Sequence, residues 1–147
     1  MSTERKYSPP TALEKTFNRL FGIIAGLGLG PADLYRLEVR GRKSGKLYSM
    51  AVCIVELNGK WYLVAPRGKT QWVRNAEVAG EVVLKRGRRR KYRVRVLSDT
   101  EKPPVLQQYL GSLKRTVQRF FPIKPDAPLQ AFAQISPGYP AFELIPA

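Results

Sequence analysis

The sequence of 147 residues contains no histidine, which excludes histidine-based catalytic triads, imidazole general bases and histidine metal ligands. The single cysteine, Cys53, excludes an internal disulfide and a cysteine-rich zinc site. Acidic residues are few, with 11 Asp and Glu against 26 Lys and Arg, and no two carboxylates stand at a spacing typical of paired acid–base groups. We therefore expect no metal site, and an enzyme built from this chain would need a bound cofactor for its chemistry.

The chain also lacks a long hydrophobic run. No segment approaches the roughly 20 apolar residues that span a bilayer. Residues 20–29 are apolar and follow Lys15 and Arg19, but the small-residue cleavage site of a signal peptide is missing. We expect a cytoplasmic protein.

What the sequence does have is positive charge, with a formal net charge of +15. Such an excess predicts an anionic partner. Nucleic acid, an anionic membrane surface and a multiply charged cofactor all meet this requirement, and charge alone does not choose among them.

The N-terminal part of the chain predicts a short tail and one helix. Residues 1–10 are polar or proline and are expected to be disordered, whereas 11–147 form a single domain. Residues 11–27 carry an apolar stripe at helical spacing (Leu13, Phe17, Leu20, Phe21 and Ile24). This helix either packs on the domain or rests on anionic lipid at the inner face of the membrane.

The remaining pattern predicts mostly antiparallel strands. Strands are expected at 34–40, 47–57, 60–65, 81–85, 91–97 and 142–145, with Arg36, Glu38 and Arg40 on the solvent side of the first. Asn58-Gly59 is a hairpin signal. Helices are expected at 70–79, capped by Thr70 and closed by Gly80, at about 104–121, capped by Asp99 or Thr100, and at 129–134. The fold class is mainly β with peripheral helices (α+β), arranged as a small barrel.

Two basic loops are candidates for one binding site. Arg42, Lys43 and Ser44 stand between Gly41 and Gly45, and such a loop suits a phosphate or a carboxylate, although it is also an ordinary solvated turn.

The second loop contains Arg67, Gly68 and Lys69 at the start of the predicted helix 70–79, where free N–H groups favour an anion. Trp72 and Asn75 share a face of that helix and could stack on and hydrogen-bond a flat heterocycle. The alternative is that Trp72 anchors the core and Asn75 caps the helix.

A third basic stretch, residues 85–95, is interleaved with Tyr92 and Val94. A nucleic-acid-binding surface has this composition. An exposed hairpin with a basic outer face, and with Tyr92, Val94 and Val96 pointing inward, has it too. We favour the hairpin and expect no nucleic-acid partner, because no series of exposed aromatic residues accompanies the charge.

Taken together, the motifs resemble the deazaflavin-dependent nitroreductase family over about residues 17–97, and the ending Pro140-Ala141-Phe142-Glu143-Leu144 is similar to the last strand of that family. The matching motifs are Val39-Arg40-Gly41-Arg42-Lys43-Ser44-Gly45, Leu63-Val64-Ala65-Pro66-Arg67-Gly68, Trp72-Val73-Arg74-Asn75-Ala76 and Gly80-Glu81-Val82.

The resemblance implies a split β-barrel of the FMN-binding type that uses coenzyme F420, a deazaflavin with a phosphate and a polyglutamate tail. It further implies hydride transfer from the reduced coenzyme to a nitroaromatic, a quinone or another small-molecule acceptor. Arg42, Lys43 and Ser44 would hold the phosphate or the tail. Ala65, Arg67, Gly68 and Lys69 would line the coenzyme, with Trp72 and Asn75 near the ring and Tyr139 as a substrate candidate.

Other functions fit the same residues. These are an FMN-binding oxidoreductase of the same fold, a carrier of the coenzyme or a lipid without catalysis, and a basic β-barrel that binds nucleic acid. A homodimer is compatible with the barrel class.

Overall fold

The strands of the protein form one curled antiparallel sheet. The computed structural model describes residues 34–147, so the predicted tail 1–10 and the predicted helix 11–27 lie outside the described residues. Within 34–147 the sheet has seven strands in the order β2-β1-β5-β6-β7-β4-β3. They are β1 (Leu34–Arg40), β2 (Leu47–Cys53), β3 (Val55–Leu57), β4 (Lys60–Val64), β5 (Glu81–Arg86), β6 (Arg88–Val96) and β7 (Ala141–Pro146).

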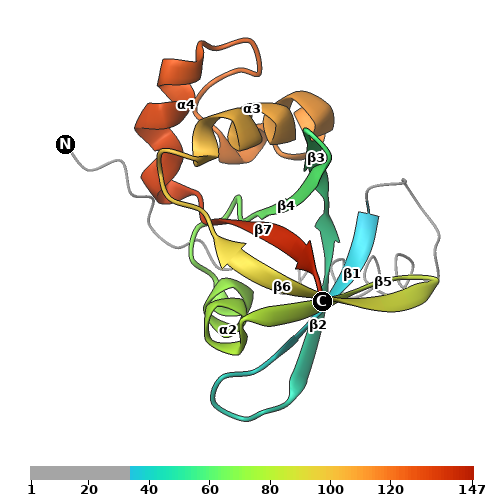
Figure 1. Cartoon of the computed structure of the whole chain (residues 1–147). Coiled ribbons are helices and arrows are strands. Elements are labelled where there is room, and N and C mark those ends of the chain that lie inside the picture. Colours follow the sequence, from blue (N-terminus) through green and yellow to red (C-terminus); the bar gives the residue numbers. More distant parts are fainter. Residues whose placement is uncertain (1–33) are drawn as a thin grey trace.

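The two edges of this sheet are consecutive in the chain. β2 lies at one end of the strand order and β3 at the other, yet a single residue, Ile54, joins them. The sheet must therefore curl until its edges approach each other, as the closure of a barrel requires. Figure 1 shows the resulting half-barrel. The single strand predicted over residues 47–57 is in fact two strands with this corner between them.

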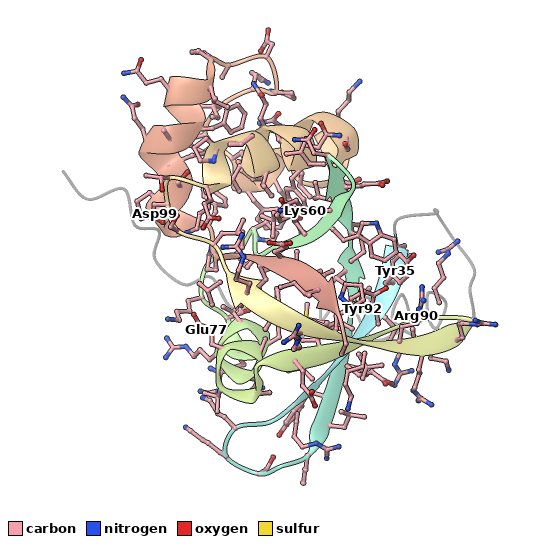
Figure 2. The ribbon with its side chains drawn as sticks, viewed as in Figure 1. Tyr35, Lys60, Glu77, Arg90, Tyr92 and Asp99 are labelled. Atoms are coloured by element: carbon pink, nitrogen blue, oxygen red, sulfur yellow. The ribbon has the colours of Figure 1, made fainter. Side chains whose placement is uncertain are left out.

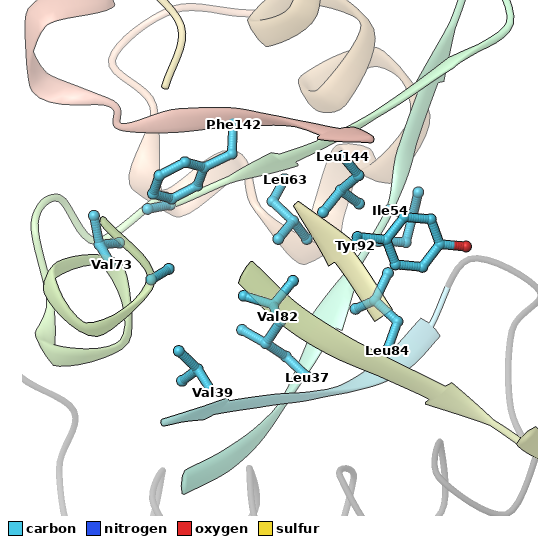
Figure 3. Packing of buried hydrophobic residues seen from close by; sticks show 12 residues of the cluster. Leu37, Val39, Ile54, Leu63, Val73, Val82, Leu84, Tyr92, Phe142 and Leu144 are labelled. Atoms are coloured by element: carbon cyan, nitrogen blue, oxygen red, sulfur yellow. The ribbon is translucent and has the colours of Figure 1, made fainter. Parts of the chain in front are cut away.

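The interior of the curled sheet holds the main hydrophobic core (Figure 3). Successive side chains of a strand point to opposite faces, so alternate residues of each strand reach the interior. Leu37 of β1, Leu84 of β5 and Phe142 of β7 are at most 1% exposed. Val73, from helix α2 (Gln71–Ala79), has no exposed surface and closes this core from one side.

A second core lies on the other side of β3 and β4. Helix α3 (Lys102–Leu113) packs on these strands and on helix α4 (Leu129–Ile135), and Figure 1 shows both helices above the sheet. Leu106, Leu110 and Phe132 are fully buried there. Three short 3-10 turns complete the chain: η1 (Lys114–Thr116), η2 (Gln118–Phe120) and η3 (Ser136–Gly138).

Several predicted elements are confirmed. The hairpin at Asn58 and Gly59 joins β3 to β4, and both residues have a positive φ, at 54° and 77°. Helix α2 begins after Thr70 and ends at Gly80, whose φ of 74° is the left-handed cap expected of glycine. The closing strand β7 is also confirmed, and pairs with both β4 and β6.

Helix α3 differs from its prediction at both ends. It does not reach residue 121 but stops at Leu113, because Lys114 has a φ of 36° that an α-helix cannot continue. Neither Asp99 nor Thr100 is its N-cap. Glu101 takes that position, and its carboxylate accepts the Ser98 backbone N–H at 2.9 Å.

Two exposure predictions were also wrong. Glu38 is only 3% exposed, because the Arg89 guanidinium donates to both its carboxylate oxygens at 2.9 and 3.2 Å, and Arg36 lies 3.5 Å away. These cations neutralise a carboxylate that would otherwise stay in water. Val96, expected to point inward, is 54% exposed at the end of β6.

Candidate functional site

The first basic loop is a tight turn between β1 and β2. The Gly41 N–H donates to the Lys46 carbonyl at 2.7 Å, and the Gly45 N–H donates to the Gly41 carbonyl at 3.0 Å. A Cβ at Gly41 would lie 2.6 Å from the Tyr48 ring, so this position needs glycine for the ring to cover it. Lys43 and Ser44 are exposed at the tip.

Arg42 fastens this loop to helix α2. Its guanidinium donates to Asn75 Oδ1 at 2.8 Å and to Gln71 Oε1 at 2.9 Å, and its backbone N–H donates to Asn75 Oδ1 at 3.1 Å. Asn75 is only 6% exposed, so its amide oxygen is committed to the loop. Arg42 and Asn75 are 33 residues apart in the chain. Their contact brings the first loop to α2, the helix that the second loop precedes.

The second basic loop connects β4 to α2. The Ala65 N–H donates to the Pro140 carbonyl at 2.8 Å, which ties the loop to the start of β7. Gly68 has a φ of 85°, and its carbonyl accepts the Thr70 N–H at 2.9 Å. The Arg67 guanidinium lies 4.8 Å from the centre of the Phe120 ring, and the Lys69 ammonium lies 3.1 Å from Glu77.

The N-terminus of α2 has open hydrogen-bond donors. The backbone amides of residues 71–73 have no backbone acceptor within residues 34–147. The amide of Arg74 is the first that does, and it donates to the Thr70 carbonyl at 3.2 Å. Thr70 makes no side-chain cap bond, although it was predicted as the cap, and its buried hydroxyl has no partner among the described residues. No acidic side chain lies in the first turn. These donors and the helix dipole favour an anion.

A cleft of about 190 Å³ borders this region. Trp72, partly buried, lies on the Phe142 ring at a centroid distance of 5.9 Å, and Phe142 forms part of the wall. The wall combines apolar surface with three charged groups. It consists of Lys69, Glu77, Val96, Leu97, Lys102, Pro137, Gly138, Pro140, Ala141 and Phe142.

Lys102 is a site residue that sequence reasoning missed. It is 6% exposed, and its ammonium donates to Asp99 Oδ1 at 2.8 Å and to the Ser136 carbonyl at 3.1 Å. The only sign of Lys102 in the sequence is its spacing of three residues from Asp99. This spacing indicates a local ion pair but does not predict that Lys102 lines a cleft. Gln71, which accepts a hydrogen bond from Arg42, was missed as well.

Tyr139 lies apart from this arrangement. It has no exposed surface, stacks on Phe121 at a centroid distance of 4.4 Å and donates its hydroxyl hydrogen to the Phe120 carbonyl. Its ring and its hydroxyl are therefore both engaged in the second core, and Tyr139 does not line the cleft.

Neither a metal site nor a membrane span is found in the part of the chain that the structure describes. Residues 34–147 contain no cluster of three or more metal-ligating side chains. No helix among them is both long enough and apolar enough to cross a bilayer.

Comparison with known proteins finds similarity in three dimensions. No protein-family model and no curated protein matches the chain. A solved structure described as a domain-swapped dimer has a TM-score of 0.54 and 18% identity, over 90% of this chain and 92% of that one.

An F420-H2 dependent reductase, FDR-A, has a TM-score of 0.51 and 19% identity, over 76% of this chain and 93% of that one. A pyridoxamine 5'-phosphate oxidase-related, FMN-binding protein from Nostoc punctiforme has a TM-score of 0.56 and 11% identity, over 93% of this chain and 81% of that one. Likeness at this level of identity defines the fold. The predicted split barrel is confirmed: the chain has the fold of the FMN-binding split-barrel proteins.

Proposed function

We propose that the protein is an oxidoreductase that binds the anionic coenzyme F420 and transfers hydride from its reduced form to an organic acceptor, such as a nitroaromatic or a quinone. The observation that carries this proposal is the convergence of both basic loops on the open N-terminus of α2, through the bonds of Arg42 to Asn75 and Gln71. The similarity in fold to an F420-H2 dependent reductase supports the choice of coenzyme.

The residues at this position fit a ligand with several negative charges. The amides of the first turn of α2 and the hydroxyl of Thr70 have unused donor capacity among the described residues, which suits a phosphate. Lys43 and Ser44, exposed on the adjoining loop, would hold the acidic tail, where a flexible lysine and a hydroxyl can follow a chain of carboxylates.

The ring system would lie toward the cleft beside Trp72 and Phe142. Of the loop residues proposed to line the coenzyme, Lys69 lines this cleft, whereas Ala65 and Gly68 are buried next to it in the chain. The bound coenzyme would supply the hydride. The role of the chain is to orient it and to stabilise the negative charge that develops on the acceptor, for which Arg67, Lys69 and Lys102 provide the cations.

The cleft is smaller than the roughly 300–1,000 Å³ of ordinary ligand pockets. One copy of the chain therefore encloses only part of a tricyclic coenzyme, and a second copy would supply the remaining wall. We accordingly propose a homodimer, in keeping with the dimeric state of one similar structure.

FMN is the alternative cofactor, because one similar structure is described as FMN-binding. FMN carries a single phosphate, which the N-terminus of α2 would bind without help from the loop 41–45. F420 differs in its tail, so the contribution of Lys43 distinguishes the two cofactors.

The test is a titration of the full chain with F420 and with FMN. We expect low-micromolar F420 binding that Lys43→Ala weakens about tenfold, the value of one charge-assisted contact of about 1.4 kcal/mol. Lys124→Ala, an exposed lysine in the helical layer, is the matched control and should leave the affinity unchanged. Tighter binding of FMN that is insensitive to Lys43→Ala would favour the alternative.

A second variant separates binding from folding. Thr70→Val removes a hydroxyl that has no partner in the described residues, so stability should be unchanged or higher, whereas F420 affinity should fall. Catalysis is followed by the oxidation of reduced F420 with menadione or a nitroaromatic. Binding without turnover would indicate a carrier, and tight DNA binding with a steep salt dependence and no coenzyme binding would contradict the proposal.

A further inference from the structure

A second cleft, of about 200 Å³, lies at the end of the barrel interior away from α2. It is formed by side chains of β1, β4, β5 and β6. Figure 2 shows Tyr35, Tyr92 and Arg90 close together at this place. The described residues that line it have two chemical types besides one leucine, namely aromatic rings and guanidinium groups. The residues are Tyr35, Trp61, Leu84, Arg86, Arg88, Arg90 and Tyr92.

The aromatic residues form a continuous wall. The Trp61 ring stacks on Tyr92 at a centroid distance of 5.9 Å and an interplanar angle of 28°. Tyr35 meets Trp61 edge-on at 5.7 Å and 60°. Tyr92 is 5% exposed, while Tyr35 and Trp61 are partly buried, so the wall retains ring surface that faces the cleft. Such a surface favours a flat aromatic ligand.

The arginines form the rim because of strand alternation. Arg88 and Arg90 share a face of β6 with Tyr92, and Arg86 stands directly opposite Arg88 across the hairpin. Arg86 donates to the Leu34 carbonyl at 2.8 Å. Arg88 and Arg90 are exposed and form no ion pair with any residue of 34–147.

Within residues 34–147, no acidic side chain lines the cleft. Glu38 lies on the other face of the sheet, where it is bound by Arg89, and Glu56, the cross-strand partner of Trp61, does not line the cleft. Like charges directly opposite each other in a sheet are destabilising. Arg86 and Arg88 stand opposite each other, and a bound anion would reduce the repulsion between them.

The hydroxyl of Tyr35 stays protonated in this setting. Burial raises its pKa and Tyr92 raises it further, while Arg86 and Arg90 lower it by a smaller amount. At neutral pH the cleft therefore offers phenolic and guanidinium donors.

We propose that this cleft is a second ligand site, separate from the site at α2, which takes a small planar anion of the aromatic carboxylate class. Guanidinium groups bind a carboxylate through two parallel hydrogen bonds, and Trp61 with Tyr35 supplies the surface for the ring. The volume is below that of pockets for drug-sized molecules, which restricts the ligand to about one ring. The proposal does not depend on the coenzyme of the first site.

The experiment uses the fluorescence of Trp61. Trp61 and Trp72 are the only tryptophans in the chain, so the full-length Trp72→Phe protein reports on Trp61 alone. Benzoate should change the emission with a Kd of about 1 mM, as expected for a ligand of this size. Cyclohexanecarboxylate, which has the same charge and no aromatic face, and benzyl alcohol, which has the ring and no charge, should each bind at least about fivefold more weakly.

Three arginine variants test the rim, one of them as the control. In the Trp72→Phe protein, Arg90→Gln should weaken benzoate binding at least about fivefold, and Arg88→Gln should act in the same direction. Arg93→Gln removes the same charge from the same strand on the opposite face, where Arg93 pairs with Glu81 in the register, and should leave the affinity unchanged.

Several results would overturn the proposal. One is the absence of a saturable response to benzoate, and another is equal loss of affinity in the Arg90 and Arg93 variants, which would indicate non-specific charge. Equal affinity for cyclohexanecarboxylate would remove the role of the aromatic wall. Tighter binding of inorganic phosphate or of single-stranded DNA would assign the cleft to another ligand class. Competition between benzoate and F420 would show that the two ligands bind at one site.

Discussion

Replacing Asn75 by alanine tests the link between the first basic loop and α2. The buried amide oxygen of Asn75 accepts two hydrogen bonds from Arg42, one from the guanidinium at 2.8 Å and one from the backbone N–H at 3.1 Å. Within residues 34–147 the Arg42 backbone N–H has no other acceptor. The variant therefore removes the main attachment of the loop 41–45 and leaves Gln71 as the remaining partner of the Arg42 side chain.

The expected loss of stability follows from these two bonds. A hydrogen bond to a charged group contributes about 1.5–3 kcal/mol and a neutral one about 0.5–1.5 kcal/mol. Arg42 is partly exposed, so water replaces part of what is lost, and we expect the free energy of unfolding to fall by about 2 kcal/mol. For a domain of this length that corresponds to a decrease in Tm of about 4–8 °C.

The assay is urea unfolding of Asn75→Ala, Arg42→Ala and the double variant. The cycle should give a coupling energy of about 1–2 kcal/mol, because each single variant removes the same contact. Gln71→Ala, which loses one exposed bond, is the matched control and should change stability by less than about 1 kcal/mol.

Two outcomes would refute the reasoning. If Asn75→Ala unfolds within about 0.5 kcal/mol of the unmodified protein, the two bonds do not hold the loop. If stability falls as expected but F420 affinity does not change, the loop 41–45 is not part of the coenzyme site.

Three further predictions concern the scaffold. Gly41→Ala should lower the free energy of unfolding by about 1 kcal/mol, since the new Cβ would lie 2.6 Å from the Tyr48 ring. In urea unfolding, the double variant with Tyr48→Ala should recover most of this loss. No recovery would exclude the clash. Leu37→Ala should lower the free energy of unfolding by about 3 kcal/mol, because Leu37 is fully buried in the main core. The midpoint of urea unfolding should fall while its slope stays constant. A loss below about 1 kcal/mol would contradict the burial of Leu37 in this core. The hydrogen bond from Arg95 lowers the pKa of Glu101 from 4.5 to about 2. The stability due to this carboxylate is therefore present above pH 4.5 and is lost as the pH falls toward 2. The Glu101→Gln variant should lose less stability over that range, and parallel curves of stability against pH for the two proteins would argue against the pairing.

Much of the secondary structure could be predicted from local sequence. Asn58 and Gly59 adopt the positive φ angles of a hairpin turn, and Gly80 ends α2 as a left-handed cap. The end of α3 could not be predicted, because Lys114, an ordinary helix former, has a positive φ there. A positive φ is unfavourable for lysine, so local preference does not predict the break.

The sequence proposes which residues form the candidate site but does not give the contacts among them. The two basic loops were recognised, since glycine and basic residues near a helix N-terminus form a local pattern. The commitment of Asn75 to Arg42 and the position of Lys102 in the cleft depend on chain segments far apart in the sequence. The burial of Tyr139 beneath Phe121 has the same origin.

The sequence by itself therefore determined most of the strands, the Asn58-Gly59 turn, the Gly80 cap of α2 and the positive charge of the loops, because these depend on side chains close together in the chain. Tertiary structure alone decided how β2 and β3 become opposite edges at Ile54 and why Glu38 is buried. It also decided that Tyr35, Trp61 and Arg90 line one cleft. The physical reason is that the curling of the sheet brings residues of β1, β4 and β6 together. The alternation of residues within one strand predicts which face a side chain is on, but not which strands lie next to it.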